Sequence, residues 1–381
     1  MKNRWSDLKI RVYSSNLLGA DENLVLAGGG NTSVKCEDIL YVKGSGWSLA
    51  NIKEEGFAPV KLQALLDMAK KETLSDSEMV KLQREALIDK DAPNPSVEAI
   101  LHAIIPFKYV DHTHADAIVT ISNSKQGKKI IDKLYSDFLI VPYVMPGFIL
   151  AKKVHKLSKD VDWQKINGII LLNHGIFTFS NSAKESYSKM IEAVNRAEEY
   201  LKENAKIEIK EQEITKKYNL EELKRVLSQK KGYEVTLEVD NSNLAIFYSN
   251  KKNLKEFASR GVLTPEHIIR TKRAPLVLES DNDFEQKIKE YEQEYENYFK
   301  TFAKDEIMLN PAPNYVVAKG FGAISIGKDK KEAKIISQIV SHTMMAVLRA
   351  DELGGYESID LKKSFDMEYW ELEQAKLKVK I

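Results

Sequence analysis

Residues 109–116 read Tyr-Val-Asp-His-Thr-His-Ala-Asp, and residues 170–175 read Ile-Leu-Leu-Asn-His-Gly. Both segments lie in runs rich in apolar and β-branched residues, so we predict strands over 109–121 and 168–172. Side chains two residues apart on a strand share a face, which places His112 and His114 side by side. His174, at the end of a neighbouring strand, would complete a three-histidine site with one position left open, as in catalytic metal centres.

A strand can equally bury a pair of hydrogen-bonded histidines, so the His-x-His pattern alone leaves both interpretations open. The segment Pro95-Ser96-Val97-Glu98 adds a carboxylate that could transfer protons beside a metal. It opens a predicted helix that ends before Pro106, and Glu98 and His102 share one face of it because they are four residues apart. A serine and a glutamate at a helix start are also common capping residues, and that reading stays open as well.

Two glycine turns could contact an anion. Gly28-Gly29-Gly30-Asn31-Thr32-Ser33 follows the apolar run 24–27, which we predict to be a strand, and Lys43-Gly44-Ser45-Gly46 follows a second predicted strand over 39–42. Small polar side chains beside glycines can form an anion nest. Neither turn has the spacing of a P-loop or a dinucleotide fingerprint, and each is compatible with a simple tight turn.

Composition narrows the class of protein. The chain has 381 residues, a length that favours two domains. Its 57 Lys and Arg nearly balance 56 Asp and Glu, so no bulk charge predicts a nucleic-acid or membrane partner. The single cysteine, Cys36, excludes an internal disulfide, and any metal site must use histidines and carboxylates. Because no apolar run approaches the ~18 residues of a membrane span and no apolar leader is present, we expect a cytoplasmic protein.

A Lys- and Glu-rich stretch over 202–231 predicts a boundary between domains 1–205 and 206–381. In the second domain we predict a hairpin over 235–248, a helix over 282–303, two short strands over 315–326 and a helix over 330–353. Residues 170–180 and 316–326 have similar patterns, each followed by a helix, but the second copy lacks histidine. Chance similarity and a degenerate repeat that lost its ligands both explain this.

Five motifs together carry a resemblance. They are Gly-Gly-Asn-Thr-Ser-Val-Lys (29–35), Lys-Gly-Ser-Gly (43–46), Pro-Ser-Val-Glu-x-x-x-His (95–102), His-Thr-His-Ala-Asp (112–116) and Asn-His-Gly (173–175). Their order resembles the class II aldolase/adducin family, and most closely the aldolase portion of bifunctional rhamnulose-1-phosphate aldolase/alcohol dehydrogenase proteins. The similarity extends through 263–273 and 353–376.

The resemblance implies a fold and a site. The fold is a three-layer α/β/α domain around a mainly antiparallel sheet, followed by a second α/β unit, and the family implies a homo-oligomer. His112, His114 and His174 match ligands of a divalent ion, usually Zn²⁺, and Glu98 matches the catalytic acid/base. The positions that match the family's phosphate cradle are Gly30, Asn31, Ser45, Gly46 and Ser96. Val97 replaces a common serine there, and Lys43-Gly44 replaces the usual Thr-Pro.

The activity implied is reversible retro-aldol cleavage of a small phosphorylated sugar, a ketose 1-phosphate such as L-rhamnulose 1-phosphate, to dihydroxyacetone phosphate and an aldehyde. The alternatives are a pentulose-phosphate 4-epimerase and a non-catalytic adducin-like interaction module. Cupins and amidohydrolases also use His-x-His, but neither class explains the glycine turn, the Pro-Ser-x-Glu segment and Asn-His-Gly together.

Overall fold

The computed structural model describes residues 6–280 and 283–378. By its internal contacts the chain divides into two compact units, and each is described by itself. The first comprises the described residues up to 122 together with 127–200, and the second comprises 123–126 and the described residues of 201–378. None of the described helices combines the length and the apolar composition needed to cross a bilayer.

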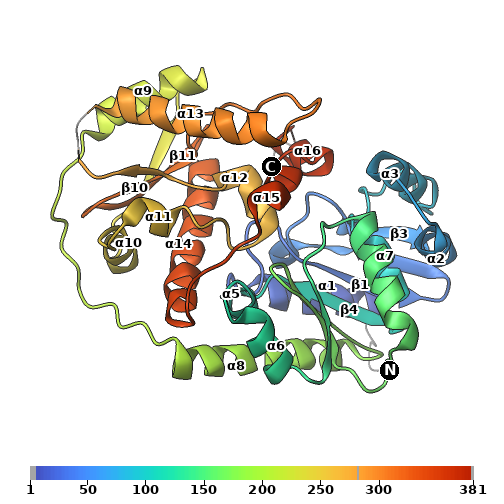
Figure 1. The fold of residues 1–381 in the computed structure, drawn as a ribbon. Coiled ribbons are helices and arrows are strands. Elements are labelled where there is room, and N and C mark those ends of the chain that lie inside the picture. Colours follow the sequence, from blue (N-terminus) through green and yellow to red (C-terminus); the bar gives the residue numbers. More distant parts are fainter. Residues whose placement is uncertain (1–5, 281–282, 379–381) are drawn as a thin grey trace. The chain divides into compact units, whose positions relative to one another are not determined.

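The first unit is built on a seven-stranded sheet in the order β3-β2-β1-β4-β7-β6-β5 (Figure 1). Its strands are β1 (Asn31–Cys36), β2 (Ile39–Lys43), β3 (Phe57–Lys61), β4 (Tyr109–Thr113), β5 (Phe138–Val141), β6 (Gly168–Leu171) and β7 (Gly175–Ser180). All neighbouring strands run antiparallel except β5 and β6, which are parallel. The predicted α/β class with a mainly antiparallel central sheet is therefore confirmed.

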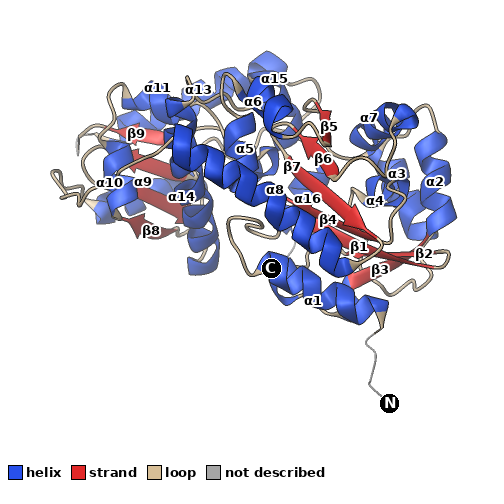
Figure 2. Ribbon diagram, turned by 90° about the horizontal axis from the view of Figure 1, so that it is seen from below, coloured by secondary structure: helices blue, strands red, loops and turns tan. Residues whose placement is uncertain are grey.

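Helices cover both faces of this sheet. They are α1 (Asp7–Gly19), α2 (Leu62–Lys70), α3 (Asp76–Glu85), α4 (Ala99–Ile104), α5 (Asp116–Ser122), α6 (Gly127–Leu134), α7 (Phe148–Leu157) and α8 (Ala183–Asn204), with short 3-10 turns at Leu49–Asn51, Glu54–Gly56 and Ser158–Asp160. α1 and α8 lie against one face, and α2, α4 and α7 pack together on the other (Figure 2).

Strand β4 shows how alternation sorts the two faces. Asp111 points to the α1 and α8 side, where it meets Arg11 and Ser186. The neighbouring residues Val110 and His112 point the other way; Val110 joins an apolar cluster with Leu101 and Ile105 beneath α4. Successive side chains on a strand alternate faces, so a single strand links a buried charge network to the histidine side of the sheet.

Two predictions of strand were wrong in part. The predicted strand 109–121 ends at Thr113, and helix α5 begins at Asp116. Residues 117–122 are buried on all sides of that helix, and a short helix buried all round has the same continuous apolar pattern as a buried strand. The run 24–27 is not a strand but a loop in which residues 24–26 are buried and Ala27 is exposed, and β1 begins only at Asn31.

The second unit contains a four-stranded sheet in the order β8-β11-β10-β9, from β8 (Thr236–Asp240), β9 (Leu276–Leu278), β10 (Tyr315–Ala318) and β11 (Gly322–Gly327). Its helices are α9 (Leu220–Lys231), α10 (Asn243–Ser249), α11 (Leu254–Ala258), α12 (Ile268–Thr271), α13 (Phe284–Phe302), α14 (Lys330–Glu352), α15 (Leu361–Glu368) and α16 (Glu371–Lys378), with a 3-10 turn at Pro265–His267. The predicted hairpin over 235–248 was wrong, because Ser242 caps α10 directly after β8.

Alternation along β10 explains the two cores of this sheet. Tyr315 and Val317 pack with α10 and α14, whereas Val316 and Ala318 pack with α9 and α13. Figure 1 shows these two pairs of helices on opposite sides of the four strands. A second α/β layer arrangement is thus present in the carboxyl-terminal half.

The two sheets share a topology. The order β8-β11-β10-β9 repeats the order β4-β7-β6-β5. The first two pairs of neighbours in each order are antiparallel, and the third pair, β10 with β9 or β6 with β5, is parallel. The hairpin turns also correspond, because Leu172 N–H donates to Val141 O over 3.0 Å and Lys319 N–H donates to Leu278 O over 2.8 Å. Asn173 and Gly320 follow these donors with φ of 60° and 70°. The two similar sequence segments therefore lie in equivalent hairpins, although the structural equivalence is shifted by one residue from the sequence pattern.

Candidate metal centre

The three predicted histidines converge. His112 is the next-to-last residue of β4, His114 directly follows the strand, and His174 lies in the turn between β6 and β7. One ring nitrogen of each lies within 4.8 Å of those of the other two. The turn delivers His174 because Asn173 adopts a left-handed conformation, which asparagine tolerates better than most residues. The predicted grouping of these side chains is present in the structure.

The hydrogen bonding of His112 fits a metal ligand. Its Nδ1 lies 3.0 Å from the carbonyl oxygen of Ile176, and a carbonyl can only accept, so Nδ1 carries the proton. In the neutral ring Nε2 is then unprotonated, and it faces His114 Nε2 at 3.0 Å. A backbone acceptor that fixes the ring tautomer in this way is typical of histidines that bind metals. Three neutral imidazoles suit Zn²⁺ or a similar divalent ion.

Glu98 lies directly beside the histidines. It is the N-cap residue of α4 and is 5% exposed. Its Oε2 lies 3.4 Å from His112 Nε2 and its Oε1 lies 3.7 Å from His174 Nε2. These distances place the carboxylate at the edge of the cluster, within reach of a molecule bound there. A buried carboxylate beside a metal can accept a proton and return it.

Asn31 links Glu98 to a second group of buried side chains. Its Nδ2 donates to Glu98 Oε2 over 2.6 Å, and its Oδ1 forms a short hydrogen bond with His102 Nε2. His102 Nδ1 in turn lies 2.8 Å from Ser33 Oγ. Burial, and then the electrostatic influence of His112, Lys35 and Arg11, hold the pKa of His102 well below its usual value. His102 is therefore neutral.

Helix α4, which carries Glu98 and His102, is fixed at its carboxyl end by Lys35. The Lys35 ammonium donates to the carbonyl oxygens of His102, Ile105 and Phe107 over 2.8, 2.6 and 2.9 Å. These carbonyls have no partner within a helix that ends at Ile104. A lysine on β1 thus ties the end of α4 to the sheet.

The predicted phosphate-cradle residues belong to three loops that the structure joins. Lys43 Nζ donates to Gly28 O over 2.9 Å, which links the two glycine turns. Ser96 N–H donates to Lys43 O over 3.0 Å, and Ser45 N–H donates to Asn94 O over 2.8 Å. Ser45 and Gly46 are exposed, whereas Gly30 is buried with φ of 63° against β4. Asn31 differs from the others because both ends of its amide are engaged with Glu98 and His102.

Sequence reasoning missed the roles of two side chains. Ser33 and His102 were quoted within motifs, but nothing in the spacing indicated that they contact each other 69 positions apart. Both are buried polar side chains, and His102 stands in the otherwise apolar helix α4. That signal marks a buried hydrogen-bonded group without naming its partner.

The second unit keeps the hairpin of the first without its ligands. Thr113 pairs with Ile176, and Asp240 pairs with Ala323 at the equivalent place. On that register the positions of His112, His114 and His174 are occupied by Val239, Asn241 and Phe321. Thr215 also covers the turn, since its N–H donates to Gly320 O over 2.8 Å. Among its described residues, the second unit therefore offers no equivalent three-histidine centre.

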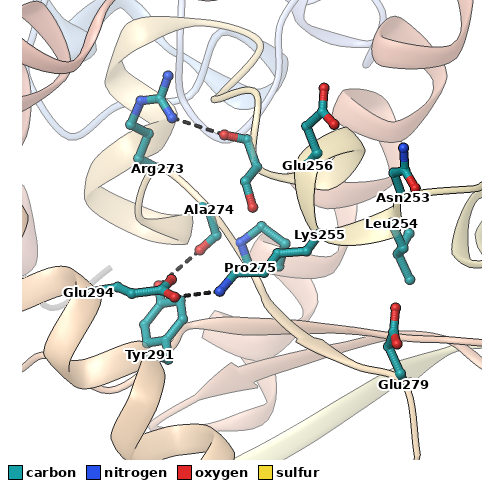
Figure 3. A pocket seen from close by; sticks show the side chains of 11 residues that line it. Asn253, Leu254, Lys255, Glu256, Arg273, Ala274, Pro275, Glu279, Tyr291 and Glu294 are labelled. Carbon is teal, nitrogen blue, oxygen red and sulfur yellow. Dashed lines mark hydrogen bonds and ion pairs between the residues drawn. The ribbon is translucent and has the colours of Figure 1, made fainter.

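A separate open pocket of about 570 Å³ lies in the second unit (Figure 3). Its polar groups largely satisfy one another: Lys255 pairs with Glu294, Tyr291 donates to Ala274 O over 2.9 Å, and Arg273 donates to Ser259 O over 2.9 Å. None of the predicted site residues lines it. The predicted catalytic and metal-binding residues gather at the histidine cluster rather than in this pocket.

Comparisons with known proteins identify the family. Residues 11–201 match the profile "Class II Aldolase and Adducin N-terminal domain", and residues 215–377 match "Aldolase class II, second domain". The chain belongs to the class II aldolase/adducin family, as its motifs predicted.

Three individual proteins to which the chain is similar are between 16% and 40% identical to it over the matched residues. The chain is 30% identical to the uncharacterized oxidoreductase YuxG of Bacillus subtilis over 401 residues, covering 96% of this chain and 57% of that protein. The chain thus spans little more than half of that relative's length. An N-terminal class II aldolase domain from Thermoplasma acidophilum is 40% identical over 53% of this chain and 99% of its own, with a TM-score of 0.48. L-fuculose-1-phosphate aldolase from Thermus thermophilus is 16% identical over 51% and 95%, with a TM-score of 0.35.

Proposed function

We propose that the protein is a metal-dependent aldolase that cleaves a ketose 1-phosphate, with L-rhamnulose 1-phosphate as the first candidate, to dihydroxyacetone phosphate and an aldehyde. The observation that carries the proposal is the convergence of three imidazoles on one buried carboxylate. A scaffold protein has no need of an open metal site beside a proton-transfer group. Family membership supports the same class of chemistry.

His112, His114 and His174 would hold the divalent ion. When bound, the ion supplies Lewis-acid polarisation of the substrate carbonyl and the adjacent hydroxyl oxygen. The protein's own contribution is to bring the sugar phosphate to that site and to transfer the protons that leave the C4 hydroxyl and reach C3 during cleavage. Ser45, Gly46 and Ser96, on loops joined at Lys43, are the groups we propose for the phosphate, together with the Gly30 turn.

Glu98 is the proposed proton carrier. As the C3–C4 bond breaks, the C4 hydroxyl releases its proton and becomes the aldehyde, and the electron pair of the bond passes to C3, which must gain a proton to become the hydroxymethyl carbon of dihydroxyacetone phosphate. Glu98 delivers that proton in cleavage and removes it in synthesis. Its burial excludes bulk water, which would otherwise compete for the same carbon. Glu98→Gln should keep its bound metal but lose at least ~100-fold in rate.

The test measures metal content and triose release from L-rhamnulose 1-phosphate and L-fuculose 1-phosphate, with and without a chelator. Triose that appears only without chelator supports the aldolase. Epimerised sugar without triose would identify the 4-epimerase instead. Absence of bound metal after loading with zinc would refute the metal centre and favour an adducin-like interaction module.

We also propose that the second unit is a degenerate copy of the first unit's core. The shared strand order and the equivalent hairpin hydrogen bonds support this proposal, and so do the left-handed residues Asn173 and Gly320. It would serve as a structural partner of the catalytic unit rather than as a second centre. Mutation of Phe321 should accordingly leave the metal stoichiometry unchanged.

A further inference from the structure

The side chains behind Glu98 form a chain of hydrogen bonds with a single direction. Glu98 is acceptor-only when ionised, so the group 2.6 Å from its Oε2 must be the Asn31 amide N–H. The Asn31 oxygen therefore faces His102, which requires His102 Nε2 to carry a proton. Since the ring is neutral, Nδ1 accepts, and Ser33 O–H is its donor at 2.8 Å.

We infer that His102 and Ser33 are positioning residues that act through Asn31 to hold the Glu98 carboxylate in its proton-transfer geometry. This inference rests on the proposed role of Glu98 as acid/base. Every donor in the series Ser33, His102, Asn31 points toward the carboxylate, so the chain favours one rotamer of Glu98 and one rotamer of Asn31. The four side chains are 0%, 0%, 6% and 5% exposed in the order Ser33, His102, Asn31, Glu98.

Because these four side chains are buried, the direction of each hydrogen bond between them matters. Water cannot readily replace a lost donor inside this cluster, and a buried acceptor left unpaired is costly. Asn31 would otherwise be free to rotate its amide and present its oxygen to Glu98, which repels an ionised carboxylate. The ring of His102 is held in turn by an edge contact with Phe177, whose own ring stacks on His112. The proton-transfer group and the metal ligand thus share one support.

The sequence did not indicate the hydrogen bonds that Asn31 makes with Glu98 and His102. Its match to a phosphate position predicted an amide pointing at the substrate. In the structure the Nδ2 and Oδ1 atoms are both directed into the protein. A residue that holds Glu98 influences the rate of proton transfer, whereas a phosphate ligand influences substrate affinity. Loss of the positioning role should therefore lower kcat, whereas loss of a phosphate contact should raise KM.

The first experiment reads the ring tautomer without using activity. In zinc-loaded protein with ¹⁵N-labelled histidine, the His102 signals, assigned by their loss in His102→Gln, should show a neutral ring with the proton on Nε2. Ser33→Ala should weaken that preference. A His102 ring protonated at Nδ1, or at both nitrogens, would overturn the inference whatever the enzyme's substrate is.

The second experiment uses a matched pair of variants. The Gln side chain places its N–H where His102 has Nε2, so His102→Gln keeps the donor to Asn31, whereas the shorter Asn in His102→Asn loses it. Both variants lose the ring contact with Phe177, which controls for a purely structural effect. The readout is solvent deuterium uptake by dihydroxyacetone phosphate in zinc-loaded protein, followed by NMR together with metal content.

We expect His102→Asn to lose about 10- to 100-fold in the maximal exchange rate, with KM and metal content unchanged, and His102→Gln to recover most of that loss. Equal rates in the two variants would refute the positioning role. Absence of exchange in the wild-type protein would instead refute the proposed function, and the tautomer measurement would still decide the direction of the hydrogen-bond chain.

Discussion

Replacing Arg11 by methionine should destabilise the first unit by about 3–5 kcal/mol. Arg11 Nη2 lies 2.5 Å from Asp111 Oδ1, and both side chains are 0% exposed. The guanidinium also donates to Ser14 Oγ over 2.7 Å. Without Arg11, the Asp111 carboxylate keeps the hydroxyl of Ser186 at 2.5 Å but no countercharge. Removing one member of a buried ion pair leaves an uncompensated charge, and that penalty sets the magnitude.

A surface pair provides the control. Lys128 Nζ lies 2.5 Å from Asp132 Oδ2, the same distance, but these side chains are 66% and 45% exposed. Lys128→Met should cost less than about 1 kcal/mol because solvent screens the pair. In the double variant Arg11→Met/Asp111→Leu, both charges are removed together, so much of the loss should be recovered.

The assay is urea unfolding followed by circular dichroism, with metal content measured in parallel because Asp111 precedes His112 on β4. We expect Arg11→Met to lower the urea midpoint strongly and Lys128→Met to leave it almost unchanged. If the two single variants lost similar amounts of free energy, or if the double variant were no more stable than Arg11→Met, the reasoning from burial would be refuted.

Three further outcomes are expected. His112→Ala should bring bound zinc below half an equivalent by elemental analysis, whereas His155→Ala on α7 should retain it; equal metal in both would exclude His112 as a ligand. A Cβ at Gly175 would lie 2.3 Å from Thr113 O, so Gly175→Ala should cost about 1–3 kcal/mol in urea unfolding and reduce metal binding, and an unchanged midpoint would contradict this. Burial lowers the Lys35 pKa to about 7, whereas in the unfolded chain this lysine stays protonated up to about 10.5. The free energy of unfolding of the wild type should therefore rise relative to that of Lys35→Met as pH increases from 7 to 10. Parallel pH profiles of the two proteins would contradict this pKa shift.

The grouping of the three histidines could be predicted from the sequence because it follows from local rules. Two residues on one strand share a face, and the Asn-His-Gly turn sits beside that strand once the sheet forms. The positions of His112, His114 and His174 needed only the strand pattern and the family motifs. The position of Glu98 at the start of α4 was predicted from the Pro-Ser-Val-Glu segment, and its proposed role as acid/base came from the family resemblance.

The hydrogen-bonded series of Ser33, His102 and Asn31 beside Glu98 could not be predicted from the sequence. Ser33 and His102 lie on different elements, and their contact depends on how α4 docks on β1, which no periodicity encodes. The helix α5 was mistaken for strand for a related reason. Its Ile118, Val119 and Ile121 favour strands by local preference, but tertiary burial on all sides overrides that preference.

The repeated topology also shows how the catalytic unit is assembled. The strands shared with the second unit, β4 to β7, carry the three histidines, whereas Asn31 and Ser33 come from β1, and α4, placed between β3 and β4, supplies Glu98 and His102. The described sheet of the second unit has only the four strands that match β4 to β7. The proposed metal ligands and the proposed proton carrier therefore come from different parts of the first unit, and only the strands that carry the histidines have counterparts in the described sheet of the second unit. Grafting β1, β2, β3 and α4 onto a four-stranded sheet like that of the second unit would be a route to new lyases.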